Sequence, residues 1–342
     1  MNYKTLISEA WKYTQSNKKL IFWFGFIPSI FTTSAGILFV LYQFFSIKKS
    51  PLFDNAEHGF LYDVAIFAVD VLKGSGPLLV PLIVASVVVV IVYLLLPTLC
   101  QGGAIQVIAR HRNGQNVKVS EGVKYGLLSF LRLFEYHLLI KSFSLVAIFG
   151  EMAFVLRNMG LNTFKLMLPL FILIFVIGLV LTLLFTYADL YIVIDDEGVM
   201  PSIKKSVKLV IMNWQHTFLI TILMLIIGVR IILQIAFVLL VPGLIFLVAG
   251  YLTAVSVPYL TLAIVIIVGV TALLLASYFG GIINIFAYAV WTYTFLHLVE
   301  KQELSARIKA GEKLSKEEKR EVPDKHQIDS HAPPTGGWHS NV

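Results

Sequence analysis

Four charged residues interrupt the long apolar runs of this sequence. Lys141 and Arg230 are basic, and Glu151 and Asp189 are acidic. A charged side chain inside a bilayer is costly, so it normally pairs with an opposite charge or faces a polar cavity. Lys141 and Asp189 are predicted to lie at a similar depth in the bilayer, and so are Glu151 and Arg230. We expect two interhelical pairs around a polar interior, which either stabilise the bundle or bind an anionic head group or solute. The alternative is that the basic side chains extend to the membrane surface.

The sequence contains no recognisable catalytic or metal-binding motif. The single cysteine, Cys100, excludes an intramolecular disulfide and a multi-cysteine metal site. The eight histidines do not converge in the sequence, and there is no His-Glu-x-x-His, Gly-x-Ser-x-Gly or phosphate-binding loop. We therefore expect no catalytic residue, no metal and no cofactor. An intramembrane enzyme without a recognisable motif is kept as a third hypothesis.

Small and amide residues within the apolar runs predict helix packing. Glycine lets two helices approach closely in a membrane, and Asn or Gln side chains hydrogen-bond between helices. Close packing is expected at Gly102-Gly103, Gly150, Gly160 and Gly280-Gly281, and interhelical hydrogen bonds at Gln101, Gln106 and Asn284.

The composition is that of a membrane protein. The 342 residues are 58% hydrophobic and 14% charged, and an apolar run of about 20 residues is long enough to cross a bilayer. The formal net charge is +7, with Lys and Arg clustered beside the apolar runs and in the C-terminal tail. This placement suits anionic lipid head groups, so we expect lipid partners and no nucleic acid.

Three amphipathic segments, about 3–16, 119–133 and 199–214, are predicted to lie on the membrane surface. The third is the clearest, because apolar residues recur on one helical face and lysines lie on the other. Its apolar face consists of Ile203, Val207, Val210, Ile211 and Trp214, and its basic face of Lys204, Lys205 and Lys208. The first segment contributes Trp11 and Lys12 to the surface, and the second contributes Lys124.

These segments divide the chain into three units, each a surface helix followed by two spans. Lys12, Lys124 and Lys208 occupy equivalent positions when the segments are aligned. The fold class is therefore all-α: a polytopic bundle with about six spans, near 20–45, 77–105, 134–157, 164–194, 215–241 and 258–299. Residues 242–257 are either a re-entrant or interfacial piece or part of a seventh span, and a repeat with two crossings per unit argues against the seventh.

The charge distribution predicts the orientation. Most Lys and Arg residues outside the spans fall on the face that carries the three surface helices and the tail, and such residues are retained in the cytoplasm. Both termini are thus expected to be cytoplasmic. Residues 1–300 form the membrane domain, and 301–342 form a basic, polar tail. The last helix is expected to extend into this tail, and the Pro- and Gly-containing end to be disordered.

The end of the predicted fourth span resembles a known family. An aromatic-rich span end at 187–191 leads to the acidic turn 195–198, a Lys/Ser helix at 203–208 and then Asn213-Trp214. This order is similar to the membrane domain found with glycerophosphoryl diester phosphodiesterases and to its relatives among bacterial six-span proteins. The resemblance is specific over 187–218 and weaker over 97–141. It implies a bacterial inner-membrane protein, but not the phosphodiesterase activity, which belongs to a separate barrel domain that the non-membrane segments are too short to contain.

Three functional hypotheses follow, in this order. The first is a non-enzymatic protein that binds or organises lipid, or that scaffolds a protein partner through its tail. The second is a transporter or exporter of a lipid-like or anionic solute through the interior near Lys141, Asp189 and Arg230. The third is the intramembrane enzyme. Sequence alone does not distinguish the ligand or the oligomeric state.

Overall fold

The computed structural model describes residues 3–48, 60–74, 79–115, 117–141, 145–229 and 258–309, and these form helices joined by turns. The first six elements are α1 (Tyr3–Ser16), α2 (Lys18–Leu20), the short π-helix η1 (Ile21–Phe26), α3 (Ile27–Lys48), α4 (Phe60–Gly74) and α5 (Leu79–Arg112). The others are α6 (Glu121–Lys141), α7 (Leu145–Leu184), α8 (Ala188–Ile194), α9 (Val199–Met212), the helix Trp214–Val229 and α11 (Pro258–Lys309).

Four helical segments among the described residues are long and apolar enough to cross a membrane: Lys18–Lys48, Ile83–Arg112, Ala147–Ile194 and Ile266–Ile308. A fifth is counted if α9 and Trp214–Val229, which meet at a bend of 96°, form one broken span. The end of the predicted fifth span and the segment 242–257 lie outside the described residues. The six-span count and the threefold repeat therefore remain predictions.

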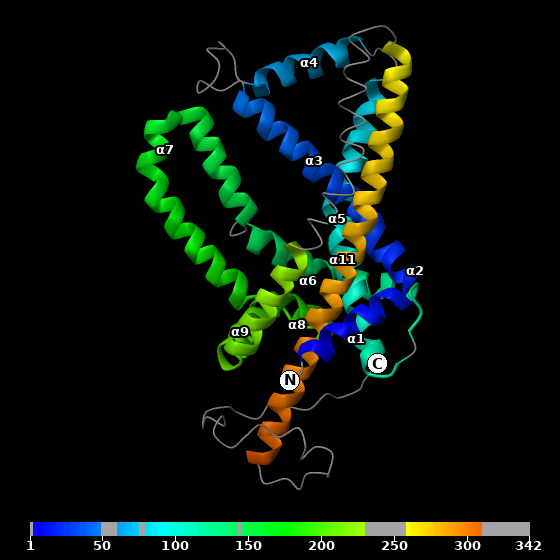
Figure 1. Ribbon diagram of the computed structural model, residues 1–342, viewed down its shortest axis with the longest axis vertical. Coiled ribbons are helices and arrows are strands. Elements are labelled where there is room, and N and C mark those ends of the chain that lie inside the picture. Colours follow the sequence, from blue (N-terminus) through cyan, green and yellow to red (C-terminus); the bar gives the residue numbers. More distant parts are fainter. Residues whose placement is uncertain are drawn as a thin grey trace.

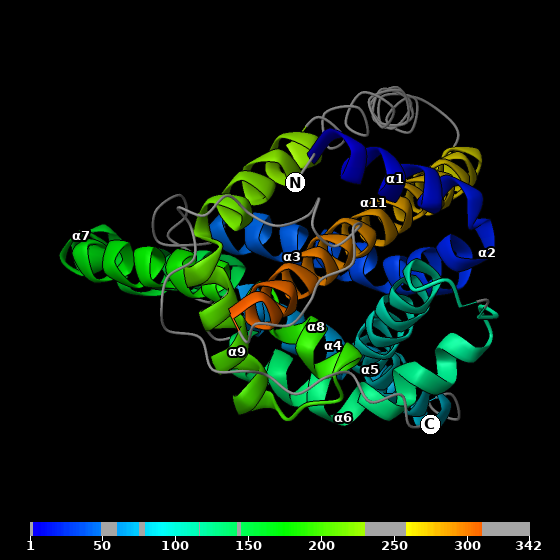
Figure 2. The same ribbon diagram turned by 90° about the horizontal axis from the view of Figure 1, so that it is seen from below.

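The packed core lies at one end of the molecule, which we call the base. It comprises α1, α6, α8 and α9 with the adjoining ends of α5 and α11 (Figure 1). Seen from below, α1, α6 and α9 lie around the end of α11 (Figure 2). One buried cluster joins α1 and η1 to α5 and α11, and a second joins α8 to α6, α9 and α11.

Away from the base the helices expose large apolar side chains. Leu38 of α3, Val80 of α5 and Leu166 of α7 are 67%, 67% and 82% exposed. Apolar surface on this scale is not stable in water and requires an apolar surrounding. The arrangement is compatible with a membrane protein whose outer helices face lipid.

Glycines bring the helices of the base into backbone contact. A Cβ atom at Gly281 of α11 would lie 2.5 Å from Phe26 N, and one at Gly25 would lie 2.6 Å from Gly281 O. At the α5–α6 contact, a Cβ atom at Gly103 would collide with Gly122 O. A Cβ atom at Gly102 would lie 2.6 Å from Ser129 Oγ, whereas one at Gly280 would make only ordinary contact with Ser29. The close packing expected at these positions is therefore present at Gly102, Gly103 and Gly281.

The chain reverses direction within α7. Gly160 has φ 78° and ψ 173°, a backbone conformation that interrupts the helix and that side-chain-bearing residues rarely adopt. The two legs fold back on each other (Figure 1), and the rings of Phe149 and Phe175 lie 5.9 Å apart between them. Gly160 thus marks a turn, not the close-packing point expected there. At Gly150 the only atom of the described residues within 4 Å of a Cβ is in Phe39, at 3.9 Å, so the described part of the chain shows no close packing there.

Two predicted helix boundaries were wrong. The second surface helix and the start of the third span, separated in the prediction at 133/134, belong to the single helix α6. The stretch 127–141 contains neither glycine nor proline, so no residue there interrupts a helix. Conversely, the predicted span 164–194 is not continuous, because α7 ends at Leu184 and α8 begins at Ala188.

We predict that Gly281→Ala lowers the free energy of unfolding by about 1–3 kcal/mol, because the methyl group has no room against Phe26. The measurement is denaturant unfolding in mixed micelles. Gly36→Ala in α3 is the matched control, since no atom of the described residues lies within 4 Å of a Cβ at Gly36. That variant should be unchanged or up to about 1 kcal/mol more stable. Equal effects of the two changes would contradict the packing argument.

Candidate functional site

The short helix α8 lies at the centre of the base and organises its polar contacts. Five of its seven residues are buried: Ala188, Leu190, Tyr191, Ile192 and Val193. Its start is held by Ser206 of α9, whose hydroxyl donates to Leu184 O at 2.8 Å and accepts from Tyr187 N at 3.1 Å. Tyr136 of α6 donates its hydroxyl to Phe185 O at 3.0 Å. Side chains from two helices thus satisfy backbone groups at the break between α7 and α8.

A hydrogen-bonded chain connects α8 to α5 and α6 through Asp189. Gln101 Nε2 of α5 donates to Asp189 Oδ2 at 2.9 Å, and Leu190 N donates to Asp189 Oδ1 at 2.9 Å. Gln101 Oε1 lies 2.9 Å from His137 Nε2 of α6. Because an amide oxygen only accepts, His137 is the donor to Gln101. The three side chains form one directed polar chain across three helices.

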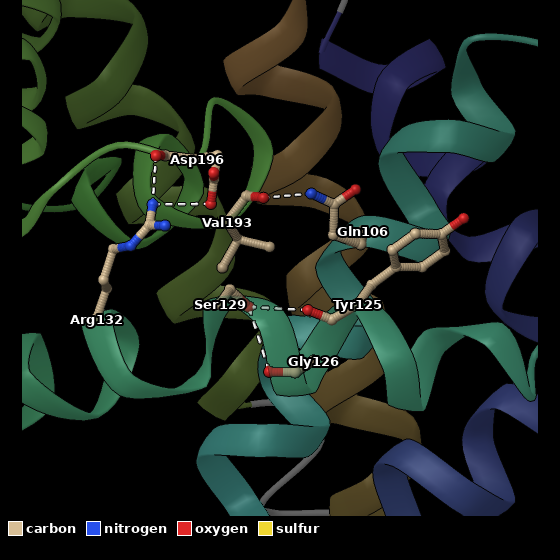
Figure 3. Close-up of polar contacts among 7 residues, drawn as sticks. All are labelled: Gln106, Tyr125, Gly126, Ser129, Arg132, Val193 and Asp196. Atoms are coloured by element: carbon tan, nitrogen blue, oxygen red, sulfur yellow. Dashed lines mark hydrogen bonds and ion pairs between the residues drawn. The ribbon is translucent and has the colours of Figure 1, made fainter. Parts of the chain in front are cut away.

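A second set of contacts joins α5 to the end of α8. Gln106 Nε2 donates to Val193 O (Figure 3). Arg110 Nε donates to Gln106 Oε1 at 3.2 Å. The Arg110 guanidinium also lies 4.2 Å from the centre of the Tyr125 ring of α6. Gln101 and Gln106 therefore make the interhelical hydrogen bonds that the sequence predicted, and Asn284 of α11 does so with Ser29 Oγ at 3.3 Å.

The acidic turn after α8 is fixed by basic side chains. Arg132 of α6 lies 2.7 Å from Asp196 Oδ1 and also donates to Asp196 O (Figure 3), and Lys205 of α9 pairs with Glu197. Asp196 has φ 56°, an uncommon value for a residue other than glycine. Its carboxyl side chain is 73% exposed, so the pair contributes at most about 1 kcal/mol and mainly sets the course of the turn.

Asp195 occupies a less polar position in the same turn. Its Oδ1 is buried and has no hydrogen-bond partner among the described residues. Burial raises the pKa of Asp195 to about 7; Lys205 acts in the opposite direction, and Glu197 and Glu303 act in the same direction. Near neutral pH this carboxyl is therefore only partly ionised, unlike an exposed aspartate.

The two predicted ion pairs are not tested by the structure. Lys141 is the last residue of α6 and its side chain lies outside the description, as does Arg230 altogether. Glu151 is exposed in the first leg of α7. Of the four charged residues, Asp189 alone is placed among polar partners, which are Gln101 and the backbone of Leu190.

The predicted membrane-surface residues are exposed on α1, α6, α9 and the start of the helix Trp214–Val229. These residues are Trp11, Lys12, Lys124, Lys204, Lys205, Lys208 and Trp214. Trp11 also packs edge-on against Phe286 of α11, with ring centres 5.4 Å apart, and is 39% exposed. Trp214 is 59% exposed. No lipid is part of the structure, so their contact with a membrane stays a prediction.

The two faces of α9 differ from the two predicted. One face packs on the protein and contains Ser202, Ser206, Leu209 and Val210. The exposed side carries the three lysines together with Ile211 and Met212, which are 62% and 49% exposed. The predicted apolar face is thus divided between the protein and the exterior. The serine face was missed because its hydroxyl groups suggest solvent, whereas the Ser206 hydroxyl bonds the backbone beside α8.

The sequence analysis also missed His137, which bonds Gln101, and Arg132, which holds Asp196 in the turn after α8. Both are common residue types near a span end, and their spacing matches no motif. Only the proximity of α6 to α8 gives them a role. No group of three or more His, Cys, Asp or Glu side chains that could hold a metal ion occurs within the described ranges.

Comparisons of the chain with protein-family models, with curated proteins and with solved structures give no match. The interpretation of the site therefore depends on its geometry.

We predict that Ser206→Ala lowers the free energy of unfolding by about 1–3 kcal/mol, because Tyr187 N and Leu184 O lose their partner in a buried position. Ser202→Ala is the matched control. Ser202 is buried on the same helix, and its hydroxyl has no hydrogen-bond partner in the described part of the chain. Denaturant titration of both variants should separate them. If Ser202→Ala were the more damaging change, the assignment of Ser206 to the helix break would be wrong.

Proposed function

We propose that this chain is a multi-pass protein of the bacterial cytoplasmic membrane that binds anionic lipid head groups at its cytoplasmic face and organises lipid there without catalysing a reaction. In this proposal the base lies at the cytoplasmic surface, both termini are cytoplasmic, and six spans form three units. The relation to the membrane domain of glycerophosphoryl diester phosphodiesterases is part of the same proposal. It rests on the residues 187–218.

The exposed side of α9 and the residue Trp214 that follows it carry this proposal. Lys204, Lys205 and Lys208 present positive charge beside the exposed apolar side chain of Ile211, and Trp214 is exposed at the start of the next helix. An exposed surface that combines lysines with apolar side chains suits the boundary between head groups and acyl chains. The bend of 96° between α9 and Trp214–Val229 supports the same placement, because one helix can then follow the surface while the next one crosses.

The position of α1 supports a common surface for the three helices. Glu9 pairs with Arg112 of α5 at 3.2 Å, and the Arg112 guanidinium lies 5.1 Å from the centre of the Tyr293 ring of α11. Tyr3 hydrogen-bonds His216 at the start of the helix that follows α9. These contacts hold α1 against the ends of crossing helices, with Lys12 exposed. In this proposal the tail 301–342 extends from the same face and binds a protein partner.

The test uses the fluorescence of Trp214 in vesicles. Trp11, Trp23, Trp291 and Trp338 are replaced by Phe, and quenching is compared between brominated phosphatidylglycerol and brominated phosphatidylcholine. We expect stronger quenching by phosphatidylglycerol, because each lysine near the surface contributes about 1 kcal/mol of attraction to anionic lipid. The triple change Lys204→Gln, Lys205→Gln, Lys208→Gln should abolish this preference, and high salt should weaken it in the parent.

The matched control removes three exposed lysines that lie on the opposite face in the proposed topology. The variant Lys48→Gln, Lys73→Gln, Lys165→Gln loses the same charge and should keep the preference at Trp214. Equal quenching by the two lipids in the parent protein, or loss of the preference in both triple variants, would refute the proposal.

The chain from Asp189 through Gln101 to His137 favours transport as the second candidate function, because polar groups inside a membrane bundle commonly line a solute path. A Gln101→Cys change in a Cys100→Ala background tests it. The lipid-binding proposal predicts that a membrane-impermeant thiol reagent leaves this cysteine unmodified in vesicles. Rapid modification would show a water-accessible interior and favour the transporter.

A further inference from the structure

The side chain of Arg157 is buried far from the base, in the first leg of α7. It is only 7% exposed and lies three residues before the turn at Gly160. The turn of α7 lies near the C-terminal half of α3 (Figure 1), and Arg157 contacts α3 there. None of the contacts described for the base reaches this residue.

All the partners of Arg157 among the described residues are neutral. Its Nη1 donates to Gln43 Oε1 at 3.0 Å, and its Nη2 donates to Tyr42 OH at 3.0 Å. The guanidinium carbon lies 5.1 Å from the centre of the Tyr42 ring and 5.8 Å from that of Phe154. No carboxylate is within 4 Å of it in the described part of the chain.

This environment leaves a charge and several donors uncompensated. A guanidinium has five N–H donors in a planar fork, and the two hydrogen bonds account for two of them. Neutral acceptors and aromatic rings reduce the cost of burying the cation but do not cancel its charge. The fork matches two oxygens of a carboxylate or a phosphate, and bidentate pairs of this kind are strong.

The surroundings favour a phosphate that carries acyl chains. Tyr42 and Gln43 lie within about 10 Å of the end of the candidate span Lys18–Lys48, at 1.5 Å of helix rise per residue. This is the depth at which a head group meets the acyl chains. Exposed apolar side chains are close by in sequence on both helices: Phe39, Phe44 and Phe154 are 42%, 62% and 48% exposed.

We propose that Arg157, oriented by Tyr42 and Gln43, binds the phosphate of a phospholipid in the leaflet opposite the base. The phosphate accepts hydrogen bonds from the free donors of the fork, and the acyl chains lie along the exposed phenylalanines. This site is separate from the lysine surface of α9 and does not depend on the proposed function of the base.

The experiment is native mass spectrometry of the full-length protein with the α9 lysines changed to Gln, so that binding at the base does not contribute. The probes are phosphatidylglycerol, a diacylglycerol with the same acyl chains, and inorganic phosphate. We expect one tightly bound phosphatidylglycerol that the diacylglycerol does not replace. Arg157→Met should weaken its binding on the order of tenfold or more, as expected for loss of charged hydrogen bonds, and Arg157→Lys should weaken it less.

Lys165→Met is the matched control, because it removes an exposed positive charge from the same end of α7 and should leave binding unchanged. If Arg157→Met does not fold, the comparison of the three probes on the protein that retains Arg157 still tests whether the site binds a phospholipid. Equal binding of phosphatidylglycerol and diacylglycerol, or displacement of the lipid by millimolar phosphate, would overturn a lipid site.

A carboxylate of the chain is the competing counter-ion. Asp54 and Glu57 are the acids of segment 49–59, which lies outside the described residues. If Asp54→Asn with Glu57→Gln destabilised the protein as much as Arg157→Met, and neither variant changed phospholipid binding, the proposal would fail. Loss of lipid binding in Arg157→Met with retention in the Asp54/Glu57 variant would support it.

Discussion

At Gly25 and Gly281 two helices meet backbone to backbone, and α5 meets α6 in the same way at Gly103 and Gly122. Lipid is as apolar as a leucine side chain, so helices in a membrane gain little from hydrophobic burial against each other and depend on close packing. These contacts set the distance between η1 and α11 and between α5 and α6. The short helix α8 packs in the base beside α5 and α6, where its apolar residues contribute to the second core cluster.

Interrupting a helix inside a bundle leaves backbone groups that a bilayer cannot satisfy. Here the backbone groups at the break, residues 184–187, are hydrogen-bonded by Ser206 of α9 and Tyr136 of α6. The same pattern recurs along α8, where Gln106 bonds Val193 O and Gln101 bonds the Asp189 carboxylate. Polar side chains in the base therefore act mainly on the backbone and on one another. The lysines and the exposed tryptophans remain directed outward.

The helical class follows from the apolar runs, and the bend after α9 follows from the amphipathic pattern of 199–214 that precedes an apolar run. A turn near residue 160 follows from the gap between the predicted spans 134–157 and 164–194, although Gly160 itself was expected to be a close-packing point. The interruption between α7 and α8 at 185–187 does not follow from such features, because no proline or glycine marks it and its backbone groups are hydrogen-bonded by side chains of α6 and α9. The role of Ser206 could not be predicted either, because a serine on a polar face is expected to be solvated. Gln101 was recognisable as an interhelical donor, but its partners Asp189 and His137 depend on how three helices meet.

The helix α11 runs for 52 residues from Pro258 to Lys309, a length of about 78 Å at 1.5 Å per residue, which is well beyond the roughly 30 Å of a bilayer's hydrocarbon core. It passes both core clusters, with Ile285 and Ala289 in the first and Phe295 and Leu298 in the second. Because the segment 285–298 is packed in both clusters, the helix is anchored in the base over several turns. Its two ends project from the base in opposite directions (Figure 1), so a single continuous helix connects the two ends of the molecule.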